Sequence, residues 1–165
     1  MKEKETVVKV GIADLNVITA PHKIRTSGLG SCVGIVLYDS FKEIAGLAHI
    51  MLPDSKLTRQ KNFNEYKYAD TAIKSLIKQM LALGARRSQL RAKLAGGAQM
   101  FQFESSSDMM RIGPRNIDAV KKELQNHRIP IISEDLGGCQ GRTIEFDPLT
   151  TKLKVRTVNE GEKFI

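Results

Sequence analysis

The sequence has no tryptophan, few aromatic residues and only two cysteines. Cys32 and Cys139 are far apart and belong to no CxxC pair, which argues against a disulfide scaffold and against a zinc ribbon. Because the basic residues are dispersed and are not interleaved with aromatic side chains, no nucleic-acid partner is expected. No apolar run reaches the roughly 18 residues of a membrane-spanning helix, so no membrane insertion is expected.

The length and net charge of the chain limit the kinds of protein that it can be. A chain of 165 residues with 41% hydrophobic residues is expected to fold as a single domain, residues 1–165, around one substantial core. The first residues, MKEKE, are charged rather than apolar, and two free thiols suit a reducing compartment, so we expect a cytoplasmic protein. The net charge of +8 favours an acidic partner or substrate.

The first third of the chain predicts β-strands. Residues 7–18 are rich in β-branched side chains and predict one or two opening strands. Two apolar segments, 33–38 and 44–52, predict a pair of neighbouring strands joined by a turn at 39–43. A loop of small residues at 26–32 precedes this pair.

The predicted hairpin brings Cys32 and His49 together, because position 32 would lie opposite roughly position 50. An isolated thiol is only slightly ionised at neutral pH, so a nucleophilic cysteine needs a base, usually a histidine. Of the three histidines, His22 lies in a turn and His127 at the polar end of a helix, whereas His49 lies inside an apolar strand. The alternative is that Cys32 and His49 are ordinary core residues.

The rest of the chain predicts two long helices and further strands. The first helix begins near residue 68, with Asp70 capping its start and Gly84 ending it. Its apolar stripe consists of Ile73, Leu76, Ile77, Met80 and Leu81. The second helix begins near Pro114, and its side chains predicted to face the core are Ile117, Val120 and Leu124. Strands are predicted at 90–94, 129–132, 142–147 and 152–158.

The loop at 26–32 is rich in glycine, and glycine-rich loops serve two kinds of function. A phosphate-binding loop is not supported, because Gly28-Leu29-Gly30 is followed by a strand rather than a helix and no Gly-Lys-Ser/Thr sequence occurs. An exposed turn of small residues around a thiol would instead let a carbonyl substrate approach, with backbone amides stabilising an oxyanion. Gly28 and Gly30 are therefore predicted to contact a substrate or partner.

Six blocks of sequence, in order, resemble the CheD family. They are TSGLGSCV (26–33), AHIMLPDS (48–55), YADTA (68–72), AGGA (95–98), IGPRN (112–116) and EDLGG (134–138). The resemblance extends from about residue 7 to residue 158, and several blocks in one order are more specific than any single motif.

The resemblance implies a protein-glutamine deamidase that converts glutamine side chains of methyl-accepting chemotaxis receptors to glutamate and ammonia through a cysteine thioester. It assigns Cys32 as the nucleophile, His49 as the base and Thr26 as the residue that orients the imidazole, with neither metal nor cofactor. Cys139 receives no catalytic role. It also implies an αββα layered sandwich with mixed β-sheets, similar to the catalytic domain of cytotoxic necrotizing factor.

Two partners follow from the same resemblance: the chemoreceptors as substrate and a CheC-type phosphatase. An alternative function is that of a non-catalytic binding regulator of such a phosphatase.

Phe101 follows the glycine loop at 95–98 and lies outside both helical stripes. It is predicted to be an aromatic anchor for a partner, although it could equally extend a strand into the core.

Overall fold

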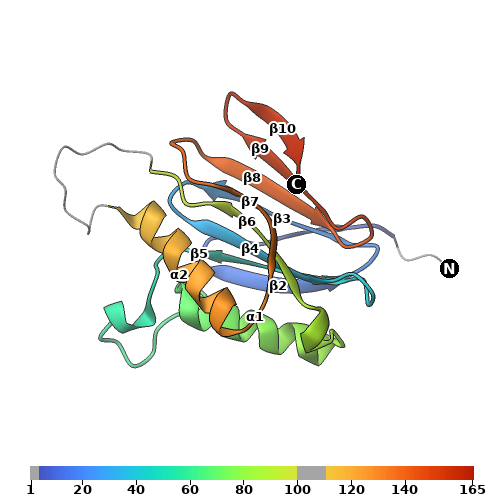
Figure 1. Cartoon of the computed structure of the whole chain (residues 1–165), viewed down its shortest axis with the longest axis horizontal. Helices are drawn as coiled ribbons and strands as arrows, with labels where there is room; N and C mark the ends of the chain where they lie inside the picture. Colours follow the sequence, from blue (N-terminus) through green and yellow to red (C-terminus); the bar gives the residue numbers. More distant parts are fainter. Residues whose placement is uncertain (1–3, 100–110) are drawn as a thin grey trace.

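Two five-stranded sheets and two long helices make up residues 4–99 and 111–165, which the computed structural model describes (Figure 1). In spatial order, the first sheet contains β1 (Val7–Lys9), β3 (Lys23–Leu29), β8 (Arg142–Asp147), β9 (Lys152–Thr157) and β10 (Gly161–Phe164). The second contains β2 (Asp14–Thr19), β5 (Ile44–Ile50), β4 (Val33–Asp39), β6 (Arg91–Gly96) and β7 (Ile131–Leu136). The helices are α1 (Ala69–Leu83) and α2 (Ile112–Asn126), with 3-10 turns η1 (Ser55–Leu57) and η2 (Arg87–Gln89).

Both sheets are mixed. The pairs β1 with β3 and β6 with β7 are parallel, and the other neighbours are antiparallel. The predicted α/β class with mixed sheets is therefore confirmed. The segment predicted at 7–18 divides between the sheets, since β1 joins one and β2 the other. The sequence pattern does not predict β10, all of whose residues are exposed.

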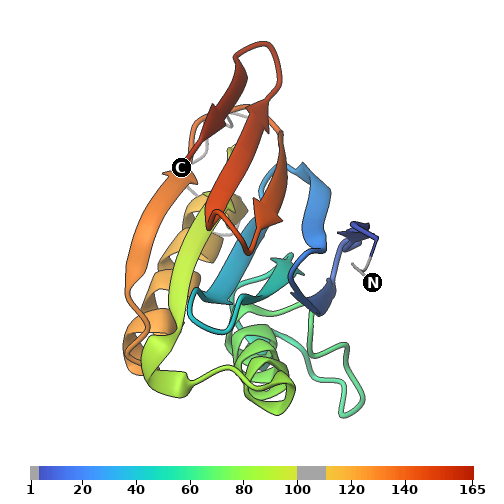
Figure 2. The same ribbon diagram turned by 90° about the vertical axis from the view of Figure 1, so that its right-hand side faces the viewer.

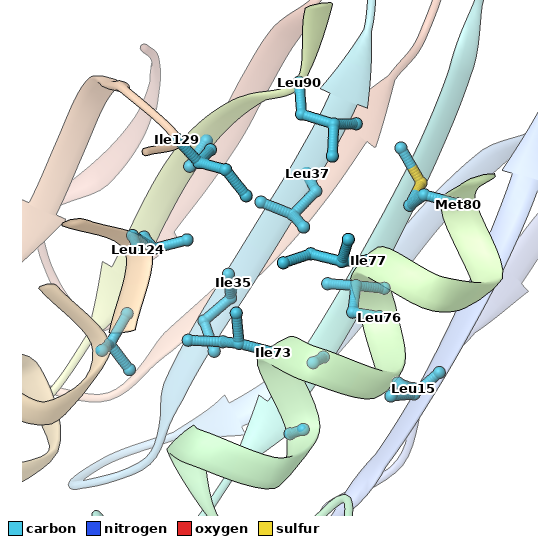
Figure 3. Packing of buried hydrophobic residues seen from close by; sticks show 14 of the residues in the cluster. Leu15, Ile35, Leu37, Ile73, Leu76, Ile77, Met80, Leu90, Leu124 and Ile129 are labelled. Atoms are coloured by element: carbon cyan, nitrogen blue, oxygen red, sulfur yellow. The ribbon is translucent and has the colours of Figure 1, made fainter. Parts of the chain in front are cut away.

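Both long helices lie on one face of the second sheet, and the first sheet covers its other face, as Figure 1 and Figure 2 show. The apolar stripe of α1 packs on this sheet, and Ile73 and Ile77 point toward β4 in Figure 3. Leu81, predicted to complete the stripe, is instead 38% exposed. In α2, Val120 and Leu124 are buried as predicted.

The ends of α1 agree only partly with the sequence. Gly84 ends the helix in a left-handed conformation with φ 117°, as predicted. Asp70 does not cap the start, because its carboxylate accepts hydrogen bonds from the backbone and the hydroxyl of Ser55 in η1. Within the two described ranges, no helix has the length and apolar character needed to cross a membrane.

The αββα layering is not what the described residues form: they make three layers, with helices on only one of the two sheets. The reason lies in the first sheet, whose strands alternate apolar and polar side chains. The inward residues of its two central strands are Ile144, Phe146, Leu153 and Val155. The intervening outward residues of these two strands are charged or polar, so they offer no apolar surface on which a helix could pack.

The predicted β4–β5 hairpin is confirmed, with a shift of one residue. Val33 pairs with Ile50 and Gly34 with His49, which places position 32 opposite position 51. The prediction of a loop at 26–32 is wrong for its first half, because Thr26 to Leu29 belong to β3. A register shift between Thr26 and Leu29 forms a β-bulge there, and bulges of this kind redirect a chain close to functional sites.

Candidate functional site

Cys32, His49 and Thr26 all face the space between the two sheets. Successive side chains of a strand point to opposite faces, and Leu47, two residues before His49, belongs to the core between the sheets. Cys32 belongs to that core at the entrance to β4, and Thr26 faces it from β3, two residues after the core residue Ile24. The three residues are 8%, 1% and 2% exposed, respectively. The structure thus gathers them from two different sheets.

A chain of hydrogen bonds fixes the ring of His49. The hydroxyl of Thr26 donates to the carbonyl oxygen of Val10 at 2.7 Å, and the same hydroxyl oxygen lies 2.7 Å from Nδ1 of His49. The hydroxyl has a single hydrogen and the carbonyl can only accept, so Nδ1 of His49 carries a proton and donates it to Thr26. The lone pair of the neutral ring is therefore on Nε2.

Nε2 of His49 is buried and has no hydrogen-bond partner among the described residues. Burial lowers the pKa of His49 from its ordinary 6.5 to about 4, and the uncharged hydroxyl of Thr26 does not oppose this shift. The ring is consequently uncharged at neutral pH. A neutral imidazole whose Nε2 lone pair is unused can accept a proton from a nucleophile.

Cys32 lies diagonally across the β4–β5 ladder from His49. Gly34 is directly opposite His49, and position 32 is the next position on the same face, where diagonal neighbours are within reach of side chains. Burial raises the pKa of the Cys32 thiol, and a hydrogen bond from its own backbone N–H lowers it in part. Since Nε2 of His49 has no partner in the described structure, the resting pair is a neutral thiol and a neutral imidazole.

Backbone hydrogen bonds hold the loop around Cys32. The N–H of Gly97 donates to the carbonyl of Cys32, and the N–H of Ala98 to that of Gly30, both at 2.8 Å. Gly96 has φ +112°, and a Cβ there would lie 2.3 Å from the carbonyl oxygen of Cys32. Position 96 therefore requires glycine for its backbone conformation and for this close approach.

Gly96→Ala is expected to lower the free energy of unfolding by roughly 2–4 kcal/mol, because alanine must adopt a positive φ and also displace the Cys32 carbonyl. Gly28→Ala is the matched control. Gly28 also has a positive φ, +73°, but an added Cβ would have nothing within 4 Å, so the loss should be about 1 kcal/mol. Urea unfolding measures both, and equal losses would show that the contact with Cys32 does not constrain position 96.

The other predicted residues divide into three groups. Gly28 is exposed in the bulge of β3, and Gly30 is half-buried beside Cys32. Cys139 is exposed in the segment between β7 and β8. Phe101 lies outside the described residues, so its predicted contact with a partner remains a prediction.

The remaining histidines have other neighbours. Nδ1 of His22 lies 2.5 Å from the hydroxyl of Thr6 near the N-terminus. Nε2 of His127 lies 3.6 Å from a carboxylate oxygen of Glu123 at the end of α2. His49 is thus the histidine that shares the core of Cys32.

Sequence reasoning missed Asn116, a fully buried residue of α2. Its side-chain Nδ2 donates to the carbonyl oxygens of Ser31 and Met51, both at 2.9 Å. The signal available in the sequence was a polar residue one turn before Val120, in line with the apolar stripe of α2.

Within residues 4–99 and 111–165, no group of three or more His, Cys, Asp or Glu side chains is placed to hold a metal ion. The expectation of a reaction without metal or organic cofactor stays a prediction.

Comparison with solved structures gives only distant likeness in sequence for the match described here. The crystal structure of Neisseria meningitidis protein NMB0706, of family DUF152, has a TM-score of 0.48 and 8% identity, and the match covers 81% of this chain and 64% of that one. The predicted likeness to the cytotoxic necrotizing factor domain is not tested by this match and stays a prediction.

Comparison of sequences gives much closer matches. A Halalkalibacterium halodurans protein named chemoreceptor glutamine deamidase CheD is 63% identical over 159 residues, covering 96% of this chain and 98% of that protein. Two further proteins of the same name are each 56% identical to this chain. The match to the Bacillus velezensis protein covers 99% of both chains, and the match to the Bacillus subtilis protein covers 96% of both. The family model described as CheD chemotactic sensory transduction matches residues 51–157. The chain therefore belongs to the CheD family.

Proposed function

We propose that the protein deamidates glutamine side chains of chemoreceptors, with Cys32 as the nucleophile and His49 as the base. The observation that carries this proposal is the 2.7 Å contact between Thr26 and Nδ1 of His49. It leaves Nε2 unprotonated and unpaired in the buried space that Cys32 shares. The relatives' printed name, chemoreceptor glutamine deamidase, supports this reaction and this class of substrate.

The first half of the reaction forms a thioester. Sγ of Cys32 attacks the carbonyl carbon of the glutamine side chain while its proton passes to Nε2 of His49. The resulting imidazolium returns the proton to the amide nitrogen. The C–N bond breaks, and ammonia leaves.

The second half restores the enzyme. Nε2 of His49 accepts a proton from a water molecule, whose oxygen attacks the thioester carbon. The C–S bond breaks, the thiol of Cys32 regains a proton, and the receptor keeps a glutamate in place of the glutamine. One water is consumed and one ammonia is released for each side chain.

Backbone amides beside the thiol are suited to stabilise the oxyanion of both steps. The N–H groups of Ser31 and Cys32 donate to no backbone carbonyl or other side chain in the described part of the chain, apart from the contact between the Cys32 N–H and its own thiol. Donors held in place before the reaction begins stabilise the developing negative charge.

Access to the thiol is proposed to run past Gly28 and Gly30. Gly28 is exposed and an added Cβ there would meet nothing within 4 Å, so a substrate backbone can approach closely. The net charge of +8 supports an acidic receptor surface as the partner. Two free thiols suit a reducing compartment and support the cytoplasm as the place of action. Phe101 is proposed to anchor the substrate or a CheC-type phosphatase.

Mass spectrometry of receptor fragments incubated with the protein tests the function. The expected result is a gain of about one dalton at defined glutamines, as amide hydrolysis requires. Tight binding of a CheC-type phosphatase with no mass gain on any receptor fragment would favour the alternative, a non-catalytic regulator.

Thr26→Val is expected to lower kcat by on the order of 10-fold or more, because Nδ1 of His49 loses its acceptor and the ring its orientation. It should also lower the free energy of unfolding by roughly 1–3 kcal/mol, because the Val10 carbonyl is left unpaired. Thr26→Ser keeps the hydroxyl and is the control. Steady-state kinetics and urea unfolding are the measurements, and equal kcat values in the two variants would exclude orientation by the hydroxyl.

A further inference from the structure

Asn116 connects the two strand ends that carry the proposed nucleophile and base. One of its Nδ2–H bonds holds the carbonyl of Ser31, the residue before Cys32. The other holds the carbonyl of Met51, which follows the last residue of β5 and lies across the ladder from position 32. A single buried amide group on α2 therefore fixes the separation of both strand ends beside the site.

The bond to Ser31 also sets the direction of a catalytic donor. The peptide between Ser31 and Cys32 is trans, so its C=O and N–H groups point in opposite directions within one rigid plane. Because Asn116 holds the C=O on the side of α2, the N–H of Cys32 points away from that helix. This N–H is close enough to the thiol of its own residue to lower the thiol pKa in part, so it lies beside the place where the carbonyl oxygen of an attacked side chain would become negatively charged.

Packing alone does not account for an asparagine at this position. The residues one and two turns later on the same face of α2, Val120 and Leu124, are fully buried and apolar. Oδ1 of Asn116 is buried without a partner among the described residues, which costs free energy. The compensating contacts are the two bonds to Ser31 and Met51.

We propose that Asn116 is a positioning residue: it orients the Ser31–Cys32 peptide as oxyanion donor and holds the thiol in register with His49, without touching the substrate. The inference rests on the proposed deamidation. Its effect on the thiol can nevertheless be measured without any substrate.

The test variant is Asn116→Leu, which has a similar size and branching but no donor. Val120→Ala is the matched control, because it weakens the same buried face of α2 without a hydrogen bond to the loop. Both are made in a Cys139→Ser background, in which Cys32 is the only thiol. Receptor deamidation gives kcat and KM, iodoacetamide gives the pH profile of Cys32 alkylation, and thermal unfolding gives Tm.

Asn116→Leu is expected to lower kcat by on the order of 10-fold or more with little change in KM, since misplaced catalytic groups affect the chemical step. The midpoint of alkylation should move to higher pH, because the N–H is no longer held at the thiolate. Val120→Ala should keep both properties of the background protein. If the two variants show the same kcat and the same alkylation midpoint, Asn116 acts only in packing and the proposal is overturned.

A second measurement is used if Asn116→Leu does not fold. Wild-type protein is then treated with a peptide in which an aldehyde replaces the glutamine amide. The thiol of Cys32 adds across the C=O bond of this aldehyde. The NMR signals of the Asn116 side-chain amide are expected to shift on adduct formation, and unmoved signals would overturn the proposal. If the wild type deamidates no receptor, the proposed function fails, while the alkylation profile still decides whether Asn116 positions the thiol.

Discussion

Cys32→Ala is expected to abolish glutamine deamidation and leave the fold intact. Removing the nucleophile from a group of residues that act together typically lowers kcat by on the order of 10⁴-fold or more. The change in stability should stay near 1 kcal/mol, because a small side chain replaces another small one at the margin of the core. Mass spectrometry of receptor fragments measures activity, and urea unfolding measures stability.

Cys139→Ser is the control for this experiment, since Cys139 is an exposed thiol. It should retain most of the wild-type activity. Turnover that persists in correctly folded Cys32→Ala would rule out the thioester mechanism. A similar loss in both variants would mean that the choice between the two cysteines is wrong.

His49→Asn is expected to lower kcat by roughly 10²–10⁴-fold, because it removes both the acceptor of the thiol proton and the donor to the leaving ammonia. Alkylation of Cys32 at neutral pH should slow as well. The measurement is the alkylation rate from pH 6 to 9 in the Cys139→Ser background. Coinciding rates with and without His49 would show that the ring is a core residue rather than the partner of the thiol.

The same substitution should change how stability depends on pH. The pKa of His49 is about 4 in the folded protein and near its ordinary 6.5 when unfolded, so the unfolded chain binds more protons between these values. The contribution of His49 to the free energy of unfolding is therefore fully present above pH 6.5. It decreases by about 3 kcal/mol as the pH falls to 4.

His49→Asn lacks this titration, so its free energy of unfolding should fall less than that of the wild type between pH 7 and pH 4. Urea unfolding at both pH values gives the difference between the two proteins, in which the titration of other groups largely cancels. Equal losses would indicate that burial does not shift the pKa of His49, so that the ring is protonated in the folded protein over the same pH range as in the unfolded chain.

The parts of the site that depend on local pattern could be predicted from the sequence. The two apolar segments around the turn at 39–43 specify a hairpin, and its pairing places Cys32 near His49 to within one residue. The stripe of α1 specifies its inner face, apart from Leu81 in the last turn. In each case the contacts involve neighbours in the chain, and side-chain periodicity determines which residues meet.

The remaining parts depend on how distant segments meet. Thr26 and His49 lie in different sheets, and no periodicity predicts which strand of one sheet faces which strand of the other. Only the family resemblance indicated Thr26. Asn116 contacts residues 65 and 85 positions away in the chain, and a lone polar residue in a helical stripe does not reveal its partners. The αββα layering was implied by the family resemblance rather than by these patterns, and the charged and polar outer residues of the first sheet explain why no described helix packs there.

The hydrogen bond between Thr26 and His49 crosses from one sheet to the other, and this has a consequence for the folding chain. Consider a molecule in which the helices have packed on the second sheet but the first sheet has not yet covered it. It contains Cys32 and His49, but the hydroxyl of Thr26 is not in place to fix the tautomer of the His49 ring. The proposed chemistry alters other proteins irreversibly. Under the proposed mechanism, full activity therefore requires both sheets to be assembled, because each of them supplies one partner of this hydrogen bond.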